Sequence, residues 1–171
     1  MNAIPGPGSP GWNTHMAEGN AHQARKRVAS DALLLDVDGR VLLVDPTYKP
    51  DWDLPGGMAE ANETPVDAVR RELAEELGLD IRFNDLLCVD WVAPHGPWDD
   101  LIAFVFDAGT LSPDACARLR PHDDEIAACA FFEPTQGLEL LGERQRRRLA
   151  HALDAVRDRV PRYLHDGNPP W

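Results

Sequence analysis

Apolar residues along the chain form short runs typical of strands and longer stretches with helical spacing. Residues 27–46 hold two runs rich in Val and Leu on either side of DVDG. Asp38 and Gly39 suit a tight turn that needs a positive φ, so this segment is predicted to be a β-hairpin. Further strands are expected around residues 81–92 and 100–107, paired antiparallel, and over EIAACAFFEP.

The clearest helix signal follows DWDLPGG, which is predicted to be a transition from a strand to a loop. Thr64 is expected to be the N-cap, with Pro65 at the first helical position and Asp67 completing a pattern similar to a capping box. Gly78 supplies a stop. Four apolar residues at helical spacing form a stripe that should pack on the core: Val66, Val69, Leu73 and Leu77.

A second helix is predicted over GERQRRRLAHALDAVRDRV. Its consecutive arginines Arg146, Arg147 and Arg148 point in different directions around a helix, so they cannot converge on one ligand. We interpret them as part of a solvated helix face. The apolar residues expected on one side of this helix are Leu149, Leu153, Val156 and Val160.

Strands interrupted by two well-separated helices favour an α/β or α+β layer structure with a mixed sheet. A chain of 171 residues is long enough for one substantial core, so a single domain is expected over residues 25–160. Residues 1–24 are rich in Gly, Pro, Asn and His, which predicts a disordered N-terminal tail. Residues 161–171 are expected to form an irregular C-terminal tail.

Charge and composition narrow the classes of partner. The chain has 29 acidic and 17 basic residues and a formal charge of -12, a field that repels a nucleic acid polymer. A small phosphorylated ligand stays compatible with this charge because a divalent cation can reverse the local sign of an acidic site. No apolar run is long enough to span a bilayer, no secretory signal pattern is present at the start, and the 3 cysteines form no CxxC pair. A cytoplasmic location without a membrane partner is therefore expected.

Three glutamates lie close together near the end of the first predicted helix. Glu72, Glu75 and Glu76 fall within a sector of about 100° on a helical wheel, so their carboxylates should converge. Such spacing brings like-charge repulsion, and a last turn also presents the negative end of the helix dipole. A hard cation such as Mg²⁺ or Mn²⁺ would remove both penalties and leave coordination positions for water and phosphate. The alternative interpretation is an acidic, solvated helix face without a role.

The segment around these glutamates resembles the Nudix box, a pattern written G-x5-E-x7-R-E-U-x-E-E-x-G-U in which U is a bulky aliphatic residue. Agreement by chance anywhere in the chain has a probability on the order of 10⁻⁷ at ordinary residue frequencies. The order of elements over residues 27–160 is more loosely similar to the Nudix α/β/α sandwich, an α/β fold with a mixed sheet between helices. Every position of the box is filled: Gly57, Glu63, Arg71, Glu72, Leu73, Glu75, Glu76, Gly78 and Leu79.

The resemblance implies a catalytic divalent metal, Mg²⁺ or Mn²⁺, held by Glu72, Glu75 and Glu76. It also implies that a backbone carbonyl of the loop containing Gly56 and Gly57 assists these glutamates. The reaction of the family is hydrolysis of a nucleoside diphosphate linked to another group X, by attack of a metal-activated water.

The family pattern also implies an ion pair between Glu63 and Arg71 that locks the loop to the helix. A base must act on the attacking water, and the two candidates are Glu72 and Glu125, because a distant acid precedes a late strand in some Nudix relatives. The alternative for Glu125 is an exposed acidic turn.

Five further residues are weaker candidates for substrate contacts. Trp52, Trp91 and Trp98 are in or beside segments expected to border the site, where an aromatic ring can stack on a nucleobase. Lys49 and His95 could contact substrate. The alternatives are core packing or loop anchoring for the tryptophans and ordinary solvation for the other two.

The resemblance leaves the substrate open among several readings. A general nucleoside phosphate derivative is the default, and an ADP-ribose or nucleotide-sugar pyrophosphatase is the alternative. A non-catalytic module that senses nucleotides or binds a partner is the alternative from another class, but the complete set of box glutamates favours hydrolysis. A homodimer is one expectation, because Nudix relatives are often dimers.

Overall fold

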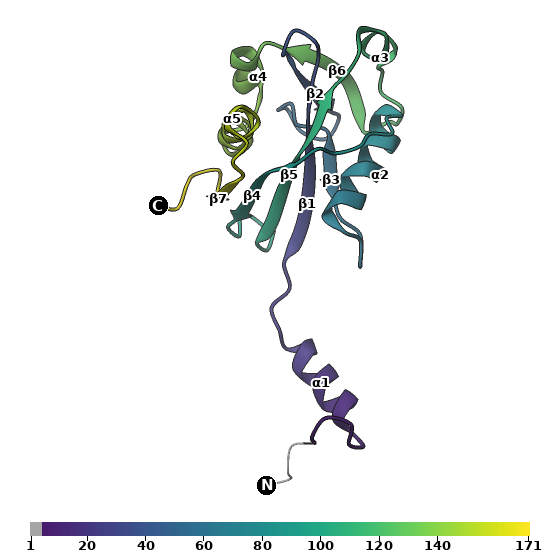
Figure 1. Cartoon of the computed structure of the whole chain (residues 1–171), viewed down its shortest axis with the longest axis vertical. Helices are drawn as coiled ribbons and strands as arrows, with labels where there is room; N and C mark the ends of the chain where they lie inside the picture. The colour runs from purple at the N-terminus through teal and green to yellow at the C-terminus, as the bar shows by residue number, and fades with distance from the viewer. Residues whose placement is uncertain (1–4) are drawn as a thin grey trace.

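The computed structural model describes residues 5–171 and contains a seven-stranded mixed sheet between helices (Figure 1). The strand order is β6-β2-β1-β5-β4-β7, and the short β3 pairs with β1 beside this path. The strands are β1 (Arg27–Leu35), β2 (Val41–Pro46), β3 (Gly56–Met58), β4 (Leu86–Val92), β5 (Leu101–Thr110), β6 (Ile126–Phe132) and β7 (Arg162–His165).

Helix α2 covers one face of the sheet, and α4 and α5 cover the other (Figure 1). This arrangement confirms the α/β sandwich with a mixed sheet. Helix α1 extends away from the body and has no buried residue. The helices are α1 (Trp12–Ala21), α2 (Pro65–Leu77), α3 (Pro113–Arg118), α4 (Pro134–Leu140) and α5 (Glu143–Asp158).

The predicted hairpin is confirmed as β1 and β2, which pair antiparallel. Gly39 has a φ of 81°, and its N–H donates to the carbonyl of Asp36 over 3.1 Å. Alternation along β1 sends Leu33 into the core under α5 and Leu34 into the core under α2. The sheet therefore has an apolar layer on both faces.

Local signals in the sequence account for α2 at both ends. The Thr64 hydroxyl accepts the N–H of Asp67 over 3.2 Å, and Pro65 occupies the first turn. Gly78 ends the helix with a φ of 65°, as its lack of a Cβ allows. Of the expected apolar stripe, Val66 is only partly buried, and the other three residues are buried in the core: Val69, Leu73 and Leu77.

The structure corrects several expected boundaries. The strand expected from residue 81 begins at Leu86, although its antiparallel pairing with β5 is confirmed. Residues 161–171 are not irregular throughout, because β7 pairs in parallel with β4 at the edge of the sheet. Only one residue of β7, Leu164, is buried, so the strand has no alternation that a sequence pattern could reveal. Helix α5 ends at Asp158, so Val160 lies outside it and is exposed.

The N-terminal segment contains one helix that the sequence did not predict. Residues 12–21 form α1 within the segment expected to be a disordered tail, and residues 1–4 lie outside the described part of the chain. No helix among residues 5–171 is long and apolar enough to cross a membrane.

Candidate active site

The glycine loop and the glutamate helix of the box meet beside β1. Gly56 and Gly57 form most of β3 and pair with Asp31 and Ser30. Gly56 has a φ of 142°, and a Cβ there would lie 2.2 Å from the carbonyl oxygen of Ser30, so only glycine fits this close approach. This packing brings the loop directly under the C-terminal half of α2.

Glu76 is the most buried of the three glutamates near the end of α2, with 7% of its surface exposed. Its carboxylate accepts the N–H of Gly56 over 3.2 Å. Burial is the main cause that raises the pKa of Glu76 to about 8, and the charges of Glu72, Asp123 and Asp31 act in the same direction. Within residues 5–171, no positively charged side chain is among the main causes that act on this pKa.

The other two glutamates share one guanidinium. Arg71 Nη1 donates to Glu72 over 2.9 Å and to Glu75 over 3.0 Å. Burial raises the pKa of Glu72 above its ordinary value, and Arg71 opposes this rise. Glu75 is the outermost of the three, with 56% of its side chain exposed. Glu72 and Glu75 thus converge on one guanidinium, whereas the carboxylate of Glu76 lies against the N–H of Gly56.

The ion pair expected between Glu63 and Arg71 is present. Two guanidinium nitrogens of Arg71 donate to the two carboxylate oxygens of Glu63, each over 3.0 Å. Arg71 Nη2 also donates to the carbonyl of Met58 over 3.0 Å. These contacts tie the loop after β3 to α2, and the guanidinium keeps the pKa of Glu63 below its ordinary value.

The donor chemistry of this cluster fits a hard divalent cation. Glu76 has a raised pKa and one N–H partner, and Glu72 and Glu75 share Arg71, so negative charge exceeds positive charge here. Among residues 5–171, no three side chains are already close enough to form a complete metal site. To complete a metal site, Glu72 would have to leave Arg71 and bind the cation instead. The flexible end of a glutamate side chain permits such a movement.

A cavity of about 310 Å³ opens beside the glycine loop. Two of the expected substrate contacts, Lys49 and His95, line it. Polar residues from β1, the segment after β2 and α5 supply most of the remaining wall: Asp31, Tyr48, Asp53, Arg144, Gln145 and Arg148. Gly56 and Gly57 line the cavity, and Gly56 also donates its N–H to Glu76, so the cavity adjoins the glutamate cluster at this loop.

None of the three tryptophans lines this cavity. Trp52 packs edge-on against Phe132 with ring centroids 5.0 Å apart, next to the core under α5. Trp91 donates its indole N–H to Asp100 over 2.9 Å. Trp98 is exposed, with the guanidinium carbon of Arg27 lying 5.0 Å from the centroid of its ring. The structure thus gives these aromatic rings packing and anchoring contacts.

Glu125 lies on the segment that leads into β6, where its carbonyl accepts the N–H of Thr47 over 2.8 Å. Its charge acts on Glu72 and is one of the causes that raise the pKa of that residue. Asp123 acts in the same way on Glu76. The distant acid therefore belongs to the electrostatic surroundings of the cluster.

Sequence reasoning missed the most buried charge beside the cavity. The interpretation of Arg148 as part of a solvated face is wrong, because it is only 4% exposed. Its Nε donates to Asp90 over 3.0 Å, and its Nη1 donates to Asp31 over 3.3 Å. These partners are 58 and 117 residues away in the chain, so local spacing could not reveal them. The available signal was the helical spacing of Arg148 with the buried Ala152 and Ala155.

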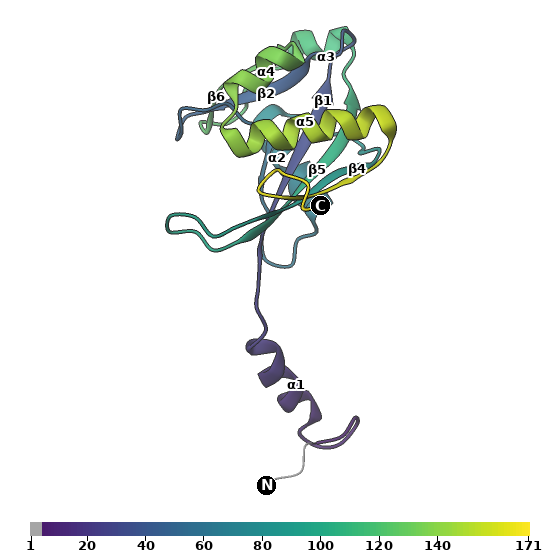
Figure 2. The same cartoon turned by 90° about the vertical axis from the view of Figure 1, so that its left-hand side faces the viewer.

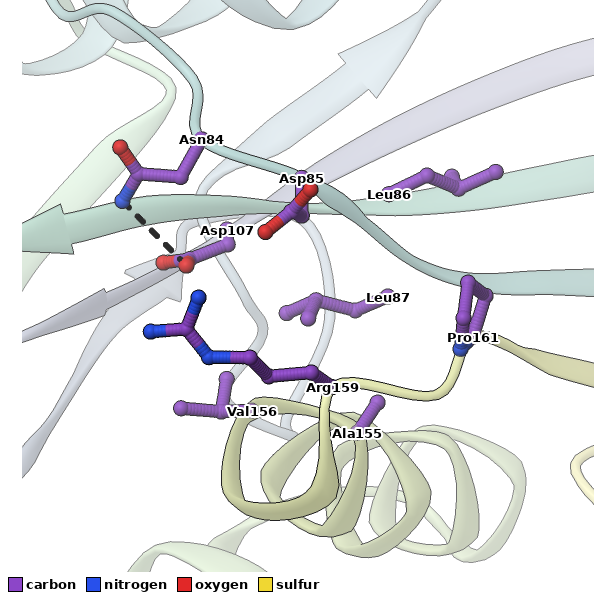
Figure 3. Close-up of a pocket in the computed structure, with 9 residues that line it drawn as sticks. All are labelled: Asn84, Asp85, Leu86, Leu87, Asp107, Ala155, Val156, Arg159 and Pro161. Atoms are coloured by element: carbon purple, nitrogen blue, oxygen red, sulfur yellow. Dashed lines mark hydrogen bonds between the residues drawn. The ribbon is translucent and has the colours of Figure 1, made fainter.

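A larger cavity, of about 550 Å³, lies between the start of β4, the end of β5 and the end of α5 (Figure 3). Arg159 and Asp107 reach toward each other across it, and Asn84 donates to Asp107 over 3.3 Å (Figure 3). No box residue lines this cavity. The cavity of about 310 Å³ is therefore the candidate active site, because Gly56 and Gly57 line it and Gly56 also donates its N–H to Glu76.

The family model described as NUDIX domain matches residues 25–153. The chain belongs to the Nudix family. A MutT-like protein from Streptomyces ambofaciens is 31% identical over 130 residues, which cover 76% of this chain and 77% of that protein. Phosphatase NudJ from Escherichia coli K12 is 29% identical over 111 residues, or 63% of this chain and 69% of that protein.

Solved structures agree with this assignment at the level of the fold. The NUDIX domain of Shewanella oneidensis NrtR, solved with ADP ribose, aligns with a TM-score of 0.65 at 20% identity and covers 82% of this chain and 97% of that chain. The resemblance drawn from the box is therefore confirmed, and this chain is a Nudix hydrolase.

Proposed function

We propose that this Nudix hydrolase cleaves a phosphoanhydride bond in a nucleoside di- or triphosphate derivative, using Mg²⁺ or Mn²⁺ held by Glu72, Glu75 and Glu76. One observation carries the proposal. Gly56 lines the cavity and also donates its N–H to Glu76, so cavity and carboxylates adjoin through a single residue. A ligand whose organic part fills the cavity would extend its phosphates toward the glutamates.

Metal binding and proton transfer would be carried out by particular residues of the site. A bound divalent ion neutralises phosphate oxygens and lowers the pKa of its water. Glu76 and Glu72 would hold the ion, and a carbonyl of the loop containing Gly56 and Gly57 would assist them. Glu72 or Glu125 would take the proton of the attacking water. Glu125→Gln separates these two bases, because Glu72 would also hold the ion and Glu125 would not: loss of the acid limb of the pH profile with metal binding intact assigns the base to Glu125, and an unchanged acid limb assigns it to Glu72.

The cavity favours a neutral, polar organic group over an additional charged one. Lys49 forms an ion pair with Asp53, Arg148 forms one with Asp31, and Arg144 forms one with Asp166. Each lysine or arginine that lines the cavity therefore has an acidic partner. Gln145 donates to Asp53 as well. The lining thus presents hydrogen-bond donors and acceptors with little net charge, which suits a nucleobase or a sugar. ADP-ribose or a nucleotide sugar is the alternative within this class, and the relative solved with ADP ribose supports its inclusion.

The test is a panel of nucleoside triphosphates, nucleoside diphosphates, ADP-ribose and nucleotide sugars, each incubated with and without Mg²⁺. We expect Mg²⁺-dependent release of phosphate, pyrophosphate or a nucleoside monophosphate from at least one member. The position of ¹⁸O from labelled water in the products identifies the bond that is attacked. Binding of nucleotides without any product over hours would contradict the proposal and favour a non-catalytic sensing module.

A further inference from the structure

The C-terminal hook, defined here as residues 162–168, lies beyond the family match, which ends at residue 153. It consists of β7 and the turn that follows it. After α5 the chain returns beneath that helix and pairs with the edge of the sheet at β4 (Figure 2). The hook therefore lies where the β4 edge and α5 meet.

Asp166 connects the two elements through four kinds of contact. Its N–H donates to the carbonyl of Trp91 over 2.9 Å, and its Oδ1 accepts the N–H of Ala93 over 3.2 Å. The same Oδ1 lies 3.1 Å from Nε of Arg144. Its carbonyl accepts from Nε and Nη2 of Arg147 over 3.1 and 2.9 Å. One residue thus fixes the end of β4 to the first turns of α5.

Gly167 supports the buried arginine from the next position. Its N–H donates to Asp90 Oδ1 over 3.0 Å, and the other oxygen of Asp90 accepts from Arg148. Gly167 has a φ of 77°, and a Cβ there would lie 2.9 Å from the Arg144 carbonyl oxygen and from Arg147 Cβ. A larger residue would therefore push the hook away from α5.

The residues that the hook holds belong to two walls of the candidate active site. Arg144 and Arg148 line the cavity from α5, and His95 lines it from the loop after β4. His95 is itself tied to Ala93, because its Nδ1 lies 2.9 Å from the Ala93 carbonyl oxygen. Neither Asp166 nor Gly167 lines the cavity, so each can act on a ligand only through these neighbours.

We propose that the hook is a positioning element for substrate recognition: Asp166 and Gly167 set the places of Arg144, Arg148 and the loop after β4. This proposal rests on the proposed function, because it concerns the organic end of the same substrate. Among residues 5–171, no hydrogen bond or ion pair joins the three glutamates of α2 to the hook, because their partners are Gly56 and Arg71. Displacing the hook should therefore change affinity for that organic end and leave the glutamates in place.

The test compares Gly167→Ala with Gly39→Ala in the full chain. Gly39 has a similar φ of 81°, but a Cβ there would meet nothing within 4 Å. Gly39→Ala therefore reproduces the backbone strain of Gly167→Ala without displacing the hook from α5. With the substrate that the panel identifies, Gly167→Ala should raise KM at least about tenfold and change kcat by less than about threefold, the scale expected for misplaced charge-assisted contacts. Gly39→Ala should leave both constants unchanged.

Asp166→Asn provides a second variant if Gly167→Ala fails to fold. It keeps the size of the side chain and removes the charge that faces Arg144, so KM should rise by a smaller factor than in Gly167→Ala or Asp166→Ala. Wild-type KM in folded Gly167→Ala or in both Asp166 variants overturns the proposal, as does a fall in kcat alone.

Failure of the proposed function has a different signature. A wild-type protein that cleaves no member of the panel contradicts the proposed function, and the hook is then judged by calorimetric binding of ADP in the presence of Mg²⁺. Weaker binding by Gly167→Ala than by Gly39→Ala supports the hook as a positioning element. Equal affinity, or no binding by the wild type, overturns it.

Discussion

Two clusters of charged residues lie on opposite faces of the sheet, and they differ in how far their positive and negative charges balance. Under α2, Glu72, Glu75 and Glu76 have one guanidinium close to them, and the pKa of Glu76 is raised to about 8. Under α5, Arg148 lies between Asp31 and Asp90 and contacts both. The first cluster opposes folding of the metal-free chain, whereas the second contributes a buried network in which each charge has a partner.

This difference in charge balance distinguishes a candidate binding site from a network that holds its neighbours in place. Carboxylates gathered without enough cations indicate that a partner is to be bound, and perturbed pKa values are typical of such sites. A balanced buried network instead fixes the geometry of its neighbours, and removing one member leaves an uncompensated charge. The clusters are also in electrostatic contact across β1, because the charge of Asp31 is one cause of the raised pKa of Glu76.

Arg148→Met should cause the largest loss of stability, and it tests whether the charges under α5 are balanced by this arginine. The substitution keeps an unbranched apolar stem but leaves Asp31 and Asp90 buried without their cation, so the free energy of unfolding should fall by about 3–5 kcal/mol. Urea denaturation measures this loss. Arg157→Met on the same helix is the matched control, because that side chain is 76% exposed, and it should change stability by less than about 0.5 kcal/mol. Equal effects of both substitutions would contradict a structural role for the Arg148 network.

Glu76→Gln should have the opposite effect on stability. In the folded chain the pKa of Glu76 is raised from 4.5 to about 8, so the folded state binds more protons than the unfolded state between these values. Without metal, the free energy of unfolding of the wild type should therefore fall as the pH rises through this window. Glu76→Gln removes this loss and should be the more stable protein near pH 8, by an amount on the order of 1–3 kcal/mol.

Urea denaturation in EDTA at several pH values checks this sign. Burial also raises the pKa of Asp31 to about 7, so only the difference between wild type and variant isolates Glu76. Glu75→Gln is the control, because its side chain is more than half exposed, and its difference from the wild type should vary much less with pH. A wild type that stays more stable than Glu76→Gln at pH 8 would show that the carboxylate is balanced within the fold.

Gly57→Ala tests the position of Glu72 with the smallest expected effect on stability. A Cβ at this position would lie 2.5 Å from Glu72 Oε1, which is the mobile end of a side chain. The backbone has no positive φ at Gly57, so folding should be nearly unaffected while the carboxylate must move. We expect turnover to fall roughly tenfold with stability changed by less than about 0.5 kcal/mol. Unchanged turnover would mean that the position of Glu72 does not matter to the reaction.

The sequence predicted the α2 side of the molecule because its determinants are local. The cap at Thr64, the stop at Gly78 and the spacing of the three glutamates all lie within one helix, and the box added the contact between Glu63 and Arg71. The hairpin was predictable for the same reason, since two apolar runs and one turn define it.

The α5 side escaped prediction because its determinants are distant in the chain. Arg148 obtains its place from Asp31 and Asp90, and β7 has a single buried residue to mark it as a strand. Trp52 shows the same limit. Its position beside the box suggested stacking on a base, but packing against Phe132 holds its ring away from the cavity. These contacts join residues that are far apart in the sequence, so they can be recognised only in the folded structure.

The most direct test of the central claim is turnover of the panel substrate at saturating Mg²⁺ by wild type, Glu72→Gln and Glu76→Gln. Glu60→Gln, which changes an exposed glutamate in the loop before α2, serves as the control. If the box glutamates hold the catalytic ion, each of the first two substitutions lowers kcat by at least about a hundredfold in a folded protein, and the control does not. Rates within about threefold of wild type in both Glu72→Gln and Glu76→Gln would contradict the claim.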